Sequence, residues 1–407
     1  MAKLLQIDVC LNWGSTGKIA EGIAKVAIDR GWNCYMIHGS RYNRPGTLMN
    51  EFQPGSKLDE YLHYAEHYFL DNDGLASRGT TRRAVEYIKK LKPDLIQIHT
   101  IHDHWLNYRI LFEYLNTLDI PIVWTQHDCW CFTGDCGHFS QFACSQWAIA
   151  CTEKCPFRNG QPWRKLLNNT AKHYRLKKEL FTIIKNLTLV PVSYWLEGVI
   201  RNSFLKEKPI KTILNGVDTD VFHPCQDKEV LKKYGLENTP YVIAAATAWS
   251  KRKGLEDYVK LAGLSGKRYK IVLVGLQGKQ ADIVLRKGII AIPRTDNQRE
   301  LAVLYSSSQV VLNLSYEESF GLTSAEGFSC GRPTVVYNST ASPELVGDSL
   351  CGRVLGGGDV AGVAAAIEEL MQENQDVLSV LCRERALKFY DKNKRFADYV
   401  NLYESLI

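Results

Sequence analysis

A chain of 407 residues, of which 45% are hydrophobic and 23% charged, is too long for one compact core and suits two domains of roughly 150–200 residues each. No apolar run reaches the roughly 20 residues that cross a bilayer, and the N-terminus MAKLLQIDVC lacks the apolar core and cleavage site of a signal peptide. We therefore expect a cytoplasmic protein. The formal net charge is +6, and residues 161–185 alone carry seven Lys or Arg against one Glu.

Strands and helices alternate through the first half of the chain. Apolar runs rich in β-branched residues predict strands, and stretches with apolar residues at helical spacing predict helices. The expected strands are 4–9, 33–38, 94–99, 120–125, 187–193 and 210–216, and the expected helices include 80–91 and 107–118. Such alternation predicts an α/β fold with a parallel sheet covered by helices.

The loop after the first strand, NWGSTGKI, carries Gly14 and Gly17 and leads into a helix. It differs from a phosphate-binding P-loop, whose spacing requires glycine where this chain has Asn12 and Ser or Thr where it has Ile19. A glycine turn between strand and helix is the better description. Such a turn lies at the edge of a parallel sheet, where ligands bind.

The strand 120–125 is followed by Gln126, His127 and Asp128. A histidine at the C-terminal end of a parallel strand is placed to meet a substrate, and it exchanges protons near neutral pH. His127 is therefore a candidate catalytic residue. His99, at the end of the preceding strand, is a weaker candidate, and a structural role for either histidine stays open.

Cysteines are frequent, with twelve in the chain and six of them between Cys129 and Cys155. Because the cytosol keeps thiols reduced, we do not expect a disulfide framework. Four of the six could close a tetrahedral structural zinc site: Cys136, Cys144, Cys151 and Cys155. The alternative is that these cysteines bind no metal and are simply buried, because a free cysteine packs like a small hydrophobic residue.

The basic segment 161–185 has an apolar stripe that includes Leu176, Leu180 and Ile184. One interpretation is an ordinary surface helix with a solvated charged face. The other is peripheral contact with anionic lipid headgroups, which would hold the protein at the inner face of the membrane.

The second half restarts the alternation after a boundary near residue 220. The expected strands are 241–247, 269–275, 288–292 and 310–315, and the expected helices are 254–264, 297–307, 359–372, 375–390 and 394–407. The polar stretch 224–240 connects the two halves. A second parallel sheet is therefore expected.

Charged residues follow two strands of this second sheet. The loop AWSKRKG, between its first strand and first helix, carries Arg252 and Lys253, and cations beside a helix N-terminus neutralise a diphosphate. Glu318 precedes a helix expected over 319–331, and Glu326 lies within that helix. Helix N-termini bind phosphate, and carboxylates accept hydrogen bonds from sugar hydroxyls. Together these features predict a nucleotide-sugar site.

The string SYEESFGLTSAEGFSCGRPTVV resembles the signature of the large retaining family-four glycosyltransferases with the two-domain GT-B fold. It has a glutamate, Phe-Gly, a second glutamate after seven intervening residues, and then Gly-x-Pro. NGVDTDVF resembles the sequence at the exit of the first domain of such enzymes. The cysteine-bearing segment resembles the insert of exopolysaccharide transferases of the colanic-acid type, in which the four candidate zinc ligands match.

The resemblance implies two Rossmann-like, doubly wound domains that face a cleft. Residues 1–220 would form the acceptor-side domain, with the cysteine-rich insert at 129–156. Residues 221–390 would form the donor domain, and the last helix, 391–407, would cross back onto the first domain. We expect Tyr399, Tyr403 and neighbouring apolar residues to form the packing face of that helix.

The resemblance also implies transfer of a sugar from a nucleoside-diphosphate donor to a saccharide or lipid-linked acceptor, with retention, in cell-surface polysaccharide biosynthesis. Lys253, with Arg252, would stabilise the leaving diphosphate, Glu326 would hold the ribose and Glu318 the transferred sugar, with His127 lining the sugar site. The residues expected at the donor are Arg252, Lys253, Glu318, Ser319, Phe320, Gly321, Leu322 and Glu326, with Gly14 and Gly17 facing its phosphates. The family's usual arginine is replaced by Ala248, so we expect Arg252 or Lys251 to supply the second positive charge.

No cofactor is required for the chemistry of such enzymes, so zinc at the cysteines would be structural. An epimerase or a phosphorylase on the same fold stays possible. A non-catalytic, zinc-containing nucleic-acid-binding protein is a third alternative. Against it, the basic segment lacks interleaved aromatic residues, and the carboxylate pair would repel a phosphate backbone, so no nucleic acid is expected.

Overall fold

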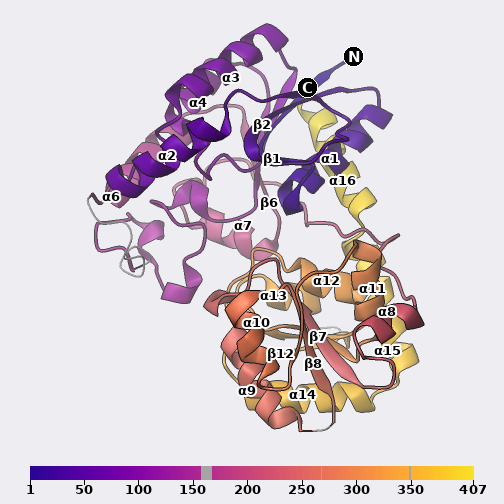
Figure 1. The fold of residues 1–407 in the computed structure, drawn as a ribbon. Helices are drawn as coiled ribbons and strands as arrows, with labels where there is room; N and C mark the ends of the chain where they lie inside the picture. The colour runs from indigo at the N-terminus through magenta and orange to yellow at the C-terminus, as the bar shows by residue number, and fades with distance from the viewer. Residues whose placement is uncertain (157–166, 267, 348–349) are drawn as a thin grey trace. The chain divides into compact units, whose positions relative to one another are not determined.

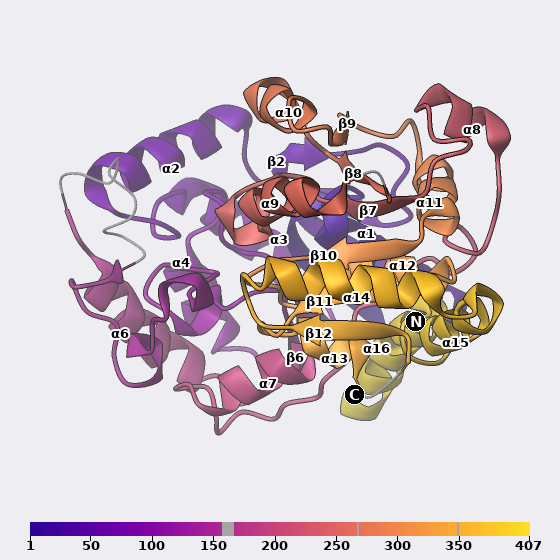
Figure 2. The ribbon, with the colours of Figure 1, turned by 90° about the horizontal axis from the view of Figure 1, so that it is seen from below.

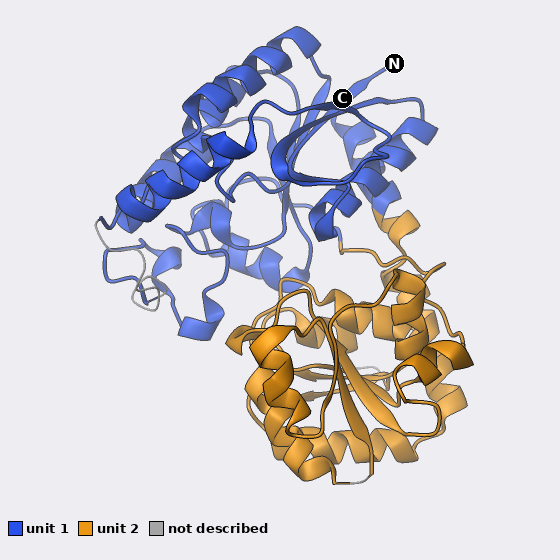
Figure 3. Ribbon diagram, viewed as in Figure 1, with its two compact units in different colours: residues 1–213, 396–407 blue, residues 214–395 orange. Residues whose placement is uncertain are grey.

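The computed structural model describes residues 1–156, 167–266, 268–347 and 350–407. The chain divides into two compact units (Figure 3). Unit 1 comprises Met1–Ile213 together with Phe396–Ile407, and unit 2 comprises Leu214–Arg395. The division thus falls at residues 213 and 395, close to the sequence-based boundaries at 220 and 390.

In the described part of unit 1, six strands form one parallel sheet (Figure 1). The strands are β1 (Lys3–Leu11), β2 (Asn33–Asn43), β3 (Asn50–Phe52), β4 (Leu95–Ile98), β5 (Ile122–Gln126) and β6 (Leu187–Pro191). Their order is β3-β2-β1-β4-β5-β6. The central strands β1, β4 and β5 are buried almost throughout, as expected of parallel strands covered on both faces.

Helices cover both faces of this sheet. They are α1 (Gly14–Asp29), α2 (Lys57–Leu70), α3 (Arg78–Leu91), α4 (Tyr108–Leu115), α6 (Thr170–Thr182), α7 (Tyr194–Arg201) and α16 (Lys392–Leu406), with short 3-10 turns at Trp130–Phe132, Ser140–Phe142 and Gln146–Ala148. Helices α1 and α16 pack in one core cluster with the sheet, and Gly22 of α1 allows their contact because a Cβ there would lie 2.1 Å from the Phe396 ring. On α4 and α6, Phe112 and Phe181 pack against Trp124.

The last helix, α16, begins in unit 2 and continues into unit 1. Its buried residues Phe396, Tyr399, Val400 and Tyr403 belong to the unit 1 core, where the Tyr403 hydroxyl donates to Gln97. The expectation that the C-terminal helix crosses back to the first domain is confirmed.

The described residues of unit 2 form a second parallel sheet, also of six strands. The strands are β7 (Tyr241–Ala245), β8 (Lys270–Val274), β9 (Ile290–Ile292), β10 (Val310–Asn313), β11 (Thr334–Tyr337) and β12 (Gly352–Leu355). Their order, β12-β11-β10-β7-β8-β9, repeats that of unit 1. In both sheets, therefore, the first and fourth strands of the unit lie side by side at the point where the strand order reverses.

The helices of unit 2 also lie on both faces of their sheet. They are α8 (Lys228–Lys233), α9 (Leu255–Ser265), α10 (Gly278–Leu285), α11 (Gln298–Ser307), α12 (Leu322–Ser329), α13 (Ser342–Val346), α14 (Val360–Gln372) and α15 (Gln375–Phe389), with a 3-10 turn, η4, at Lys251–Lys253. Helices α9 and α14 cover one face (Figure 2), and their buried residues share a cluster with β7, β8 and β10. Residues of α11 and Cys330, just after α12, pack on the other face.

Two expectations about individual elements were wrong. The segment 210–216 is not a strand; it makes a single bridge, from Ile210 to Leu189, and the amides of Lys211 and Ile213 then donate to the Leu189 and Pro191 carbonyls of β6. The helix expected over 319–331 begins only at Leu322, because Gly321 takes a left-handed conformation (φ 105°). The sequence patterns also missed seven elements: α2, α8, α10, α13, β3, β11 and β12. None of the described helices is long and apolar enough to cross a membrane.

Candidate active site

Two loops meet at the reversal point of the unit 2 sheet, where a parallel sheet binds its ligands. One loop follows β7 and ends at Gly254, and the other follows β10. Gly254 has φ 70°, and a Cβ there would lie 2.1 Å from the Leu314 carbonyl oxygen. The Tyr316 amide donates to the Arg252 carbonyl (2.8 Å). Backbone contacts therefore fix the two loops against each other.

The predicted residues Lys253 and Glu318 come together across these loops. Lys253 Nζ lies 2.5 Å from Glu318 Oε1, and the side chains are 21% and 14% exposed. The backbone of Glu318 is held as well, since its amide donates to Thr340 Oγ1 (2.8 Å) and its carbonyl accepts from the Ala341 amide (3.2 Å). Three strand-end loops thus position a half-buried cation and carboxylate at the sheet edge.

Arg252 lies beside this pair but has a different role in the structure. Its Nη1 donates to the Glu317 carbonyl (3.0 Å), which ties η4 to the loop after β10. Ala248, where the family usually has arginine, is exposed. The neighbouring Lys251 is also exposed. Among the predicted cations, Lys253 is the one whose charge is aimed at Glu318.

The predicted phosphate-binding stretch, Ser319 to Leu322, leads into the first turn of α12. The Phe320 ring is buried, 5.8 Å from the Tyr390 ring, so the side chain serves packing and only the backbone of Phe320 is available to a ligand. Ser319 and Leu322 are half-buried. Gly321 provides the sharp entry into the helix. The helix N-terminus that they form directly follows Glu318 in the chain, and an anion cradle at this N-terminus stays a prediction.

Glu326 lies in the second turn of α12 and is half-buried. The hydroxyl of Tyr305, on α11, donates to Glu326 Oε2 (3.2 Å). Burial and the Glu326 carboxylate raise the pKa of Tyr305 well above its usual value, so the phenol stays a neutral donor. Tyr305 therefore orients one oxygen of the Glu326 carboxylate.

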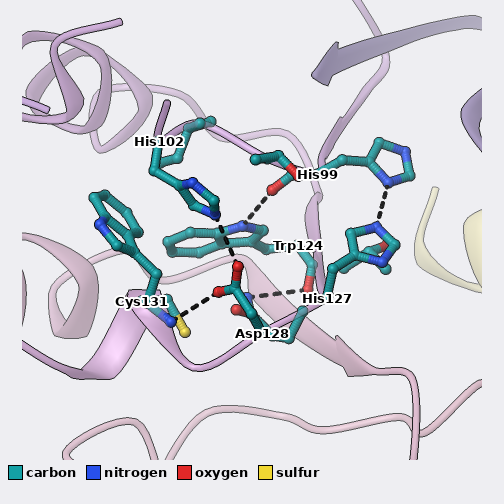
Figure 4. Close-up of a pocket in the computed structure, with 11 residues that line it drawn as sticks. His99, His102, Trp124, His127, Asp128 and Cys131 are labelled. Atoms are coloured by element: carbon teal, nitrogen blue, oxygen red, sulfur yellow. Dashed lines mark hydrogen bonds and ion pairs between the residues drawn. The ribbon is translucent and has the colours of Figure 1, made fainter. Parts of the chain in front are cut away.

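In unit 1, His127 lines a small pocket of about 10 Å³ at the ends of β4 and β5 (Figure 4). Its Nε2 lies 3.1 Å from His99 Nδ1, and His99 Nε2 lies 2.9 Å from Gln6 Oε1. Gln6 donates through Nε2 to the Ala20 carbonyl (2.9 Å), so its Oε1 accepts the proton of His99 Nε2. His99 consequently accepts at Nδ1, and His127 donates from Nε2.

This chain of hydrogen bonds fixes the state of His127. Burial lowers the pKa of His127 to about 4, against the opposing effect of Asp128, and burial lowers the pKa of His99 well below its usual value. Both histidines are therefore neutral at neutral pH. With the proton of His127 on Nε2, its Nδ1 is the acceptor, which suits a hydrogen bond from a sugar hydroxyl.

A charged pair forms another wall of the pocket. His102 Nε2 lies 2.9 Å from Asp128 Oδ2, and Trp130 donates its amide to Asp128 Oδ1 (2.8 Å) (Figure 4). Burial alone would lower the pKa of His102, but Asp128 and Asp103 raise it well above its usual value. His102 is thus a cation held by Asp128. Sequence reasoning missed His102, although three histidines in the stretch HTIHDHW were a signal.

Gly14 and Gly17 begin α1 at the reversal point of the unit 1 sheet. Gly14 has φ 66°, and a Cβ added there would meet nothing within 4 Å, so space for a ligand exists beside it. Gly17 has a packing role, because a Cβ would lie 3.1 Å from the Cys10 Cβ. Beneath them, Asp8 of β1 is fully buried, and burial raises its pKa to about 7.

All twelve cysteines lie in the described part of the chain, and none of them forms a disulfide. Cys136, Cys151 and Cys155 are buried and Cys144 is half-buried. The Gly134 amide donates to Cys151 Sγ (3.2 Å), and burial raises the pKa of Cys151 to about 11. Zinc at these four cysteines stays a prediction.

The basic segment is described only in part, since residues 161–166 lie outside the described residues. Its remainder forms α6, on which Lys172, Arg175 and Lys178 are exposed. The expected apolar stripe is present at Leu180 and Ile184, which are buried. Lys177 is buried as well and donates to the Trp130 carbonyl (2.8 Å).

Two parallel α/β units with one strand order, and a C-terminal helix shared between them, define a protein of the GT-B class. Solved structures agree over the whole chain. Sucrose-phosphate synthase from Thermosynechococcus elongatus has a TM-score of 0.71 at 16% identity, covering 100% of this chain and 99% of that one. Anabaena Alr3699/HepE, solved in complex with UDP, has a TM-score of 0.69 at 15% identity, covering 100% of each chain.

Sequence comparison narrows the class to a family. The model of glycosyltransferase family 4 matches residues 22–221, and that of glycosyl transferases group 1 matches residues 226–389. The chain belongs to these glycosyltransferases. It is 30% identical to the O-antigen chain mannosyltransferase B of Escherichia coli over 161 residues, 37% of this chain and 42% of that protein. It is 20% identical over 427 aligned positions to the E. coli K12 protein named as colanic acid biosynthesis glycosyl transferase WcaC, covering 99% of this chain and 100% of that one.

Proposed function

We propose that this glycosyltransferase moves a sugar from a nucleoside-diphosphate donor to a saccharide or lipid-linked acceptor, with retention, in the synthesis of a bacterial surface polysaccharide. The observation that carries the proposal is the Lys253–Glu318 pair, set 2.5 Å apart beside the first turn of α12 at the reversal point of a parallel sheet. A cation, a carboxylate and helix amides suit a diphosphate joined to a polyhydroxyl group. The names of the two relatives and the UDP complex of Alr3699/HepE support the same assignment.

In the proposed reaction, the bond between the anomeric carbon and the phosphate oxygen breaks, and its electron pair leaves with the diphosphate. Lys253, aided by Arg252 and the amides near Phe320 to Leu322, stabilises that charge. The acceptor hydroxyl attacks from the same face and passes its proton to the departing phosphate oxygen. No separate strong base is needed, and the configuration is retained.

The remaining predicted residues hold the two ends of the donor. Glu326, oriented by Tyr305, would accept hydrogen bonds from the ribose hydroxyls. Glu318 would do so from the transferred sugar. His127 of unit 1, neutral and accepting at Nδ1, would bind a sugar hydroxyl. Gly14 would let the donor phosphates approach the backbone.

A panel of UDP-, GDP- and ADP-sugars tests the reaction class. One of these donors should raise the melting temperature, and with an acceptor it should yield a new glycoside of unchanged anomeric configuration by NMR. Product formed without acceptor would instead identify an epimerase, and dependence on free phosphate would identify a phosphorylase. Salt-dependent oligonucleotide binding without donor binding would point to the nucleic-acid alternative.

A lipid-linked acceptor would place the protein at the inner membrane face, and the surface of unit 1 offers a contact. Helix α2 exposes several large apolar residues: Leu58, Tyr61, Leu62, Tyr64, Phe69 and Leu70. Its end meets the basic helix α6, where Asn169 Nδ2 donates to the Leu70 carbonyl (2.9 Å). Each exposed basic residue near an anionic surface contributes about 1 kcal/mol. Co-sedimentation with phosphatidylserine vesicles should fall with salt and with Lys172→Ala, and salt-insensitive binding would contradict the contact.

A further inference from the structure

A cluster of ligand-type side chains that contains no cysteine lies in unit 1. His67 near the end of α2, Asp73 in the following turn and His104 after β4 each place one ligand atom within 4.8 Å of the others. His67 and Asp73 are buried, and the His104 side chain is 19% exposed. Neither the chemistry proposed above nor the sequence resemblance gives these residues a role.

The distances around Asp73 fit metal ligands better than hydrogen bonds. Asp73 Oδ1 lies 3.7 Å from His104 Nε2 and 3.9 Å from His67 Nδ1, beyond the range of about 2.7–3.2 Å for hydrogen bonds. This oxygen is buried, and within the described residues it accepts no hydrogen bond. Two ligands of a tetrahedral Zn²⁺, each about 2.1 Å from the metal, lie roughly 3.4 Å apart. Shifts of a few tenths of an ångström would therefore close the site.

The surroundings hold the carboxylate in place for this purpose. Trp130 Nε1 donates to Asp73 Oδ2 (3.4 Å), which leaves Oδ1 facing the two imidazoles. The next amide, of Gly74, donates to His63 Nε2 (3.0 Å), and His63 Nδ1 in turn contacts Ser77 Oγ (2.8 Å). Both nitrogens of His63 are thus engaged, so it supports the turn and is no ligand. Oriented carboxylates of this kind are typical of metal sites.

The backbone at His104 is strained, and favourable interactions elsewhere must offset the cost of this strain. Asp103 (φ 72°) and His104 (φ 67°) are consecutive non-glycine residues in the left-handed region, a conformation that costs on the order of 1–3 kcal/mol each. Arg41 Nη2 donates to the Asp103 carbonyl (2.5 Å) and helps to hold this turn. The strained turn is what brings the His104 imidazole to Asp73.

We propose that His67, Asp73 and His104 bind one divalent transition-metal ion of the zinc class. Two imidazoles and one carboxylate suit zinc and its neighbours, whereas magnesium and calcium prefer oxygen ligands alone. The ion joins α2 to the loop 99–104, which carries His99 and His102 of the small pocket. Its role is to position that loop, and it takes no part in the transfer chemistry.

Metal analysis of the full-length protein, stripped with a chelator and reloaded with Zn²⁺, tests the proposal. To separate this site from the cysteines, the experiment uses the Cys151→Ser background. Asp73→Asn and His104→Gln should each remove one equivalent of zinc or weaken zinc binding by more than about 100-fold. Loss of a residue that only hydrogen-bonds to a metal ligand typically weakens metal binding by about 10–100-fold, so a larger loss identifies a ligand. The matched control His223→Gln, an exposed histidine of unit 2, should keep the full stoichiometry.

X-ray absorption on the zinc-loaded chain without any substitution covers the case in which the variants fail to fold. It should show nitrogen or oxygen ligands at about 2.0–2.1 Å. Zinc bound through sulfur alone, no zinc bound at all, or unchanged binding in folded Asp73→Asn and His104→Gln would each overturn the proposal.

Discussion

Lys253→Ala should separate catalysis from stability in the proposed active site. Lys253 Nζ lies 2.5 Å from Glu318 Oε1, and both side chains are mostly shielded, at 21% and 14% exposure. At an effective dielectric constant of about 20, a cation 4 Å from a phosphate charge contributes roughly 4 kcal/mol. Removing one positioned donor at developing charge typically costs about 2.7–4 kcal/mol, a 10²–10³-fold loss of kcat. We expect a loss of that size.

The same substitution should change stability little. A partly exposed ion pair contributes about 0–1 kcal/mol to folding, because solvent screens the charges and the side chains lose conformational freedom when they pair. The melting temperature of Lys253→Ala should therefore fall by only a few degrees. A large kinetic loss with a small stability loss would identify a group that acts on the transition state.

The assay is release of the nucleoside diphosphate at saturating donor, with a thermal melt of each variant. Lys251→Ala is the matched control, because it removes the same charge from the same turn at an exposed position. It should keep near-normal turnover. Comparable turnover in Lys253→Ala and Lys251→Ala would refute the role assigned to Lys253.

Glu318→Ala should lose most transfer activity and remain folded by circular dichroism; undiminished turnover would exclude it from the site. Gly254→Ala should destabilise unit 2 by more than about 2 kcal/mol, because its Cβ would lie 2.1 Å from the Leu314 carbonyl at φ 70°, whereas Gly263→Ala, with open space on α9, should stabilise it by roughly 0.5–1 kcal/mol in denaturant unfolding. Burial raises the pKa of Asp8 to about 7, against about 3.9 when unfolded, so its contribution to stability is full below pH 4 and is lost as pH rises to 7. Between pH 4.5 and pH 7.5 the unfolding free energy of the unsubstituted chain should therefore fall by a few kcal/mol, whereas that of Asp8→Asn should not show this fall. Equal pH dependence in the two proteins would contradict the assignment to Asp8.

The sequence predicted most strands of the two sheets because those strands are continuous apolar runs. Val310 to Leu314 has no polar interruption apart from Asn313, and it forms the centre of the second sheet as β10. The segment 210–216 is less continuous. The amides of Lys211 and Ile213 still donate to the Leu189 and Pro191 carbonyls of β6. The segment therefore lies along β6, but its hydrogen bonds are too few to make it a strand.

The candidate site was predictable in part, for a topological reason. Lys253 and Glu318 each follow a strand, and the reversal of strand order brings those strand ends together, so a short motif in each loop sufficed. The support around them was not predictable. Thr340 and Tyr305 reach Glu318 and Glu326 from loops and helices without a motif of their own.

The histidine cluster shows the same limit. His63 and His67 stand four residues apart on α2, a spacing that places both on one face of a helix, and this signal was available in the sequence. Only the structure shows that His67 faces Asp73 and His104 while His63 is engaged by Gly74 and Ser77.

Calorimetric binding of UDP, GDP and ADP to the unsubstituted chain, Lys253→Ala and Lys251→Ala tests the central claim most directly. One diphosphate should bind the unsubstituted chain and Lys251→Ala alike, and bind Lys253→Ala at least about tenfold more weakly, a difference of about 1.4 kcal/mol. Equal affinity for all three proteins, or no binding of any nucleoside diphosphate, would contradict a donor site built around Lys253 and Glu318.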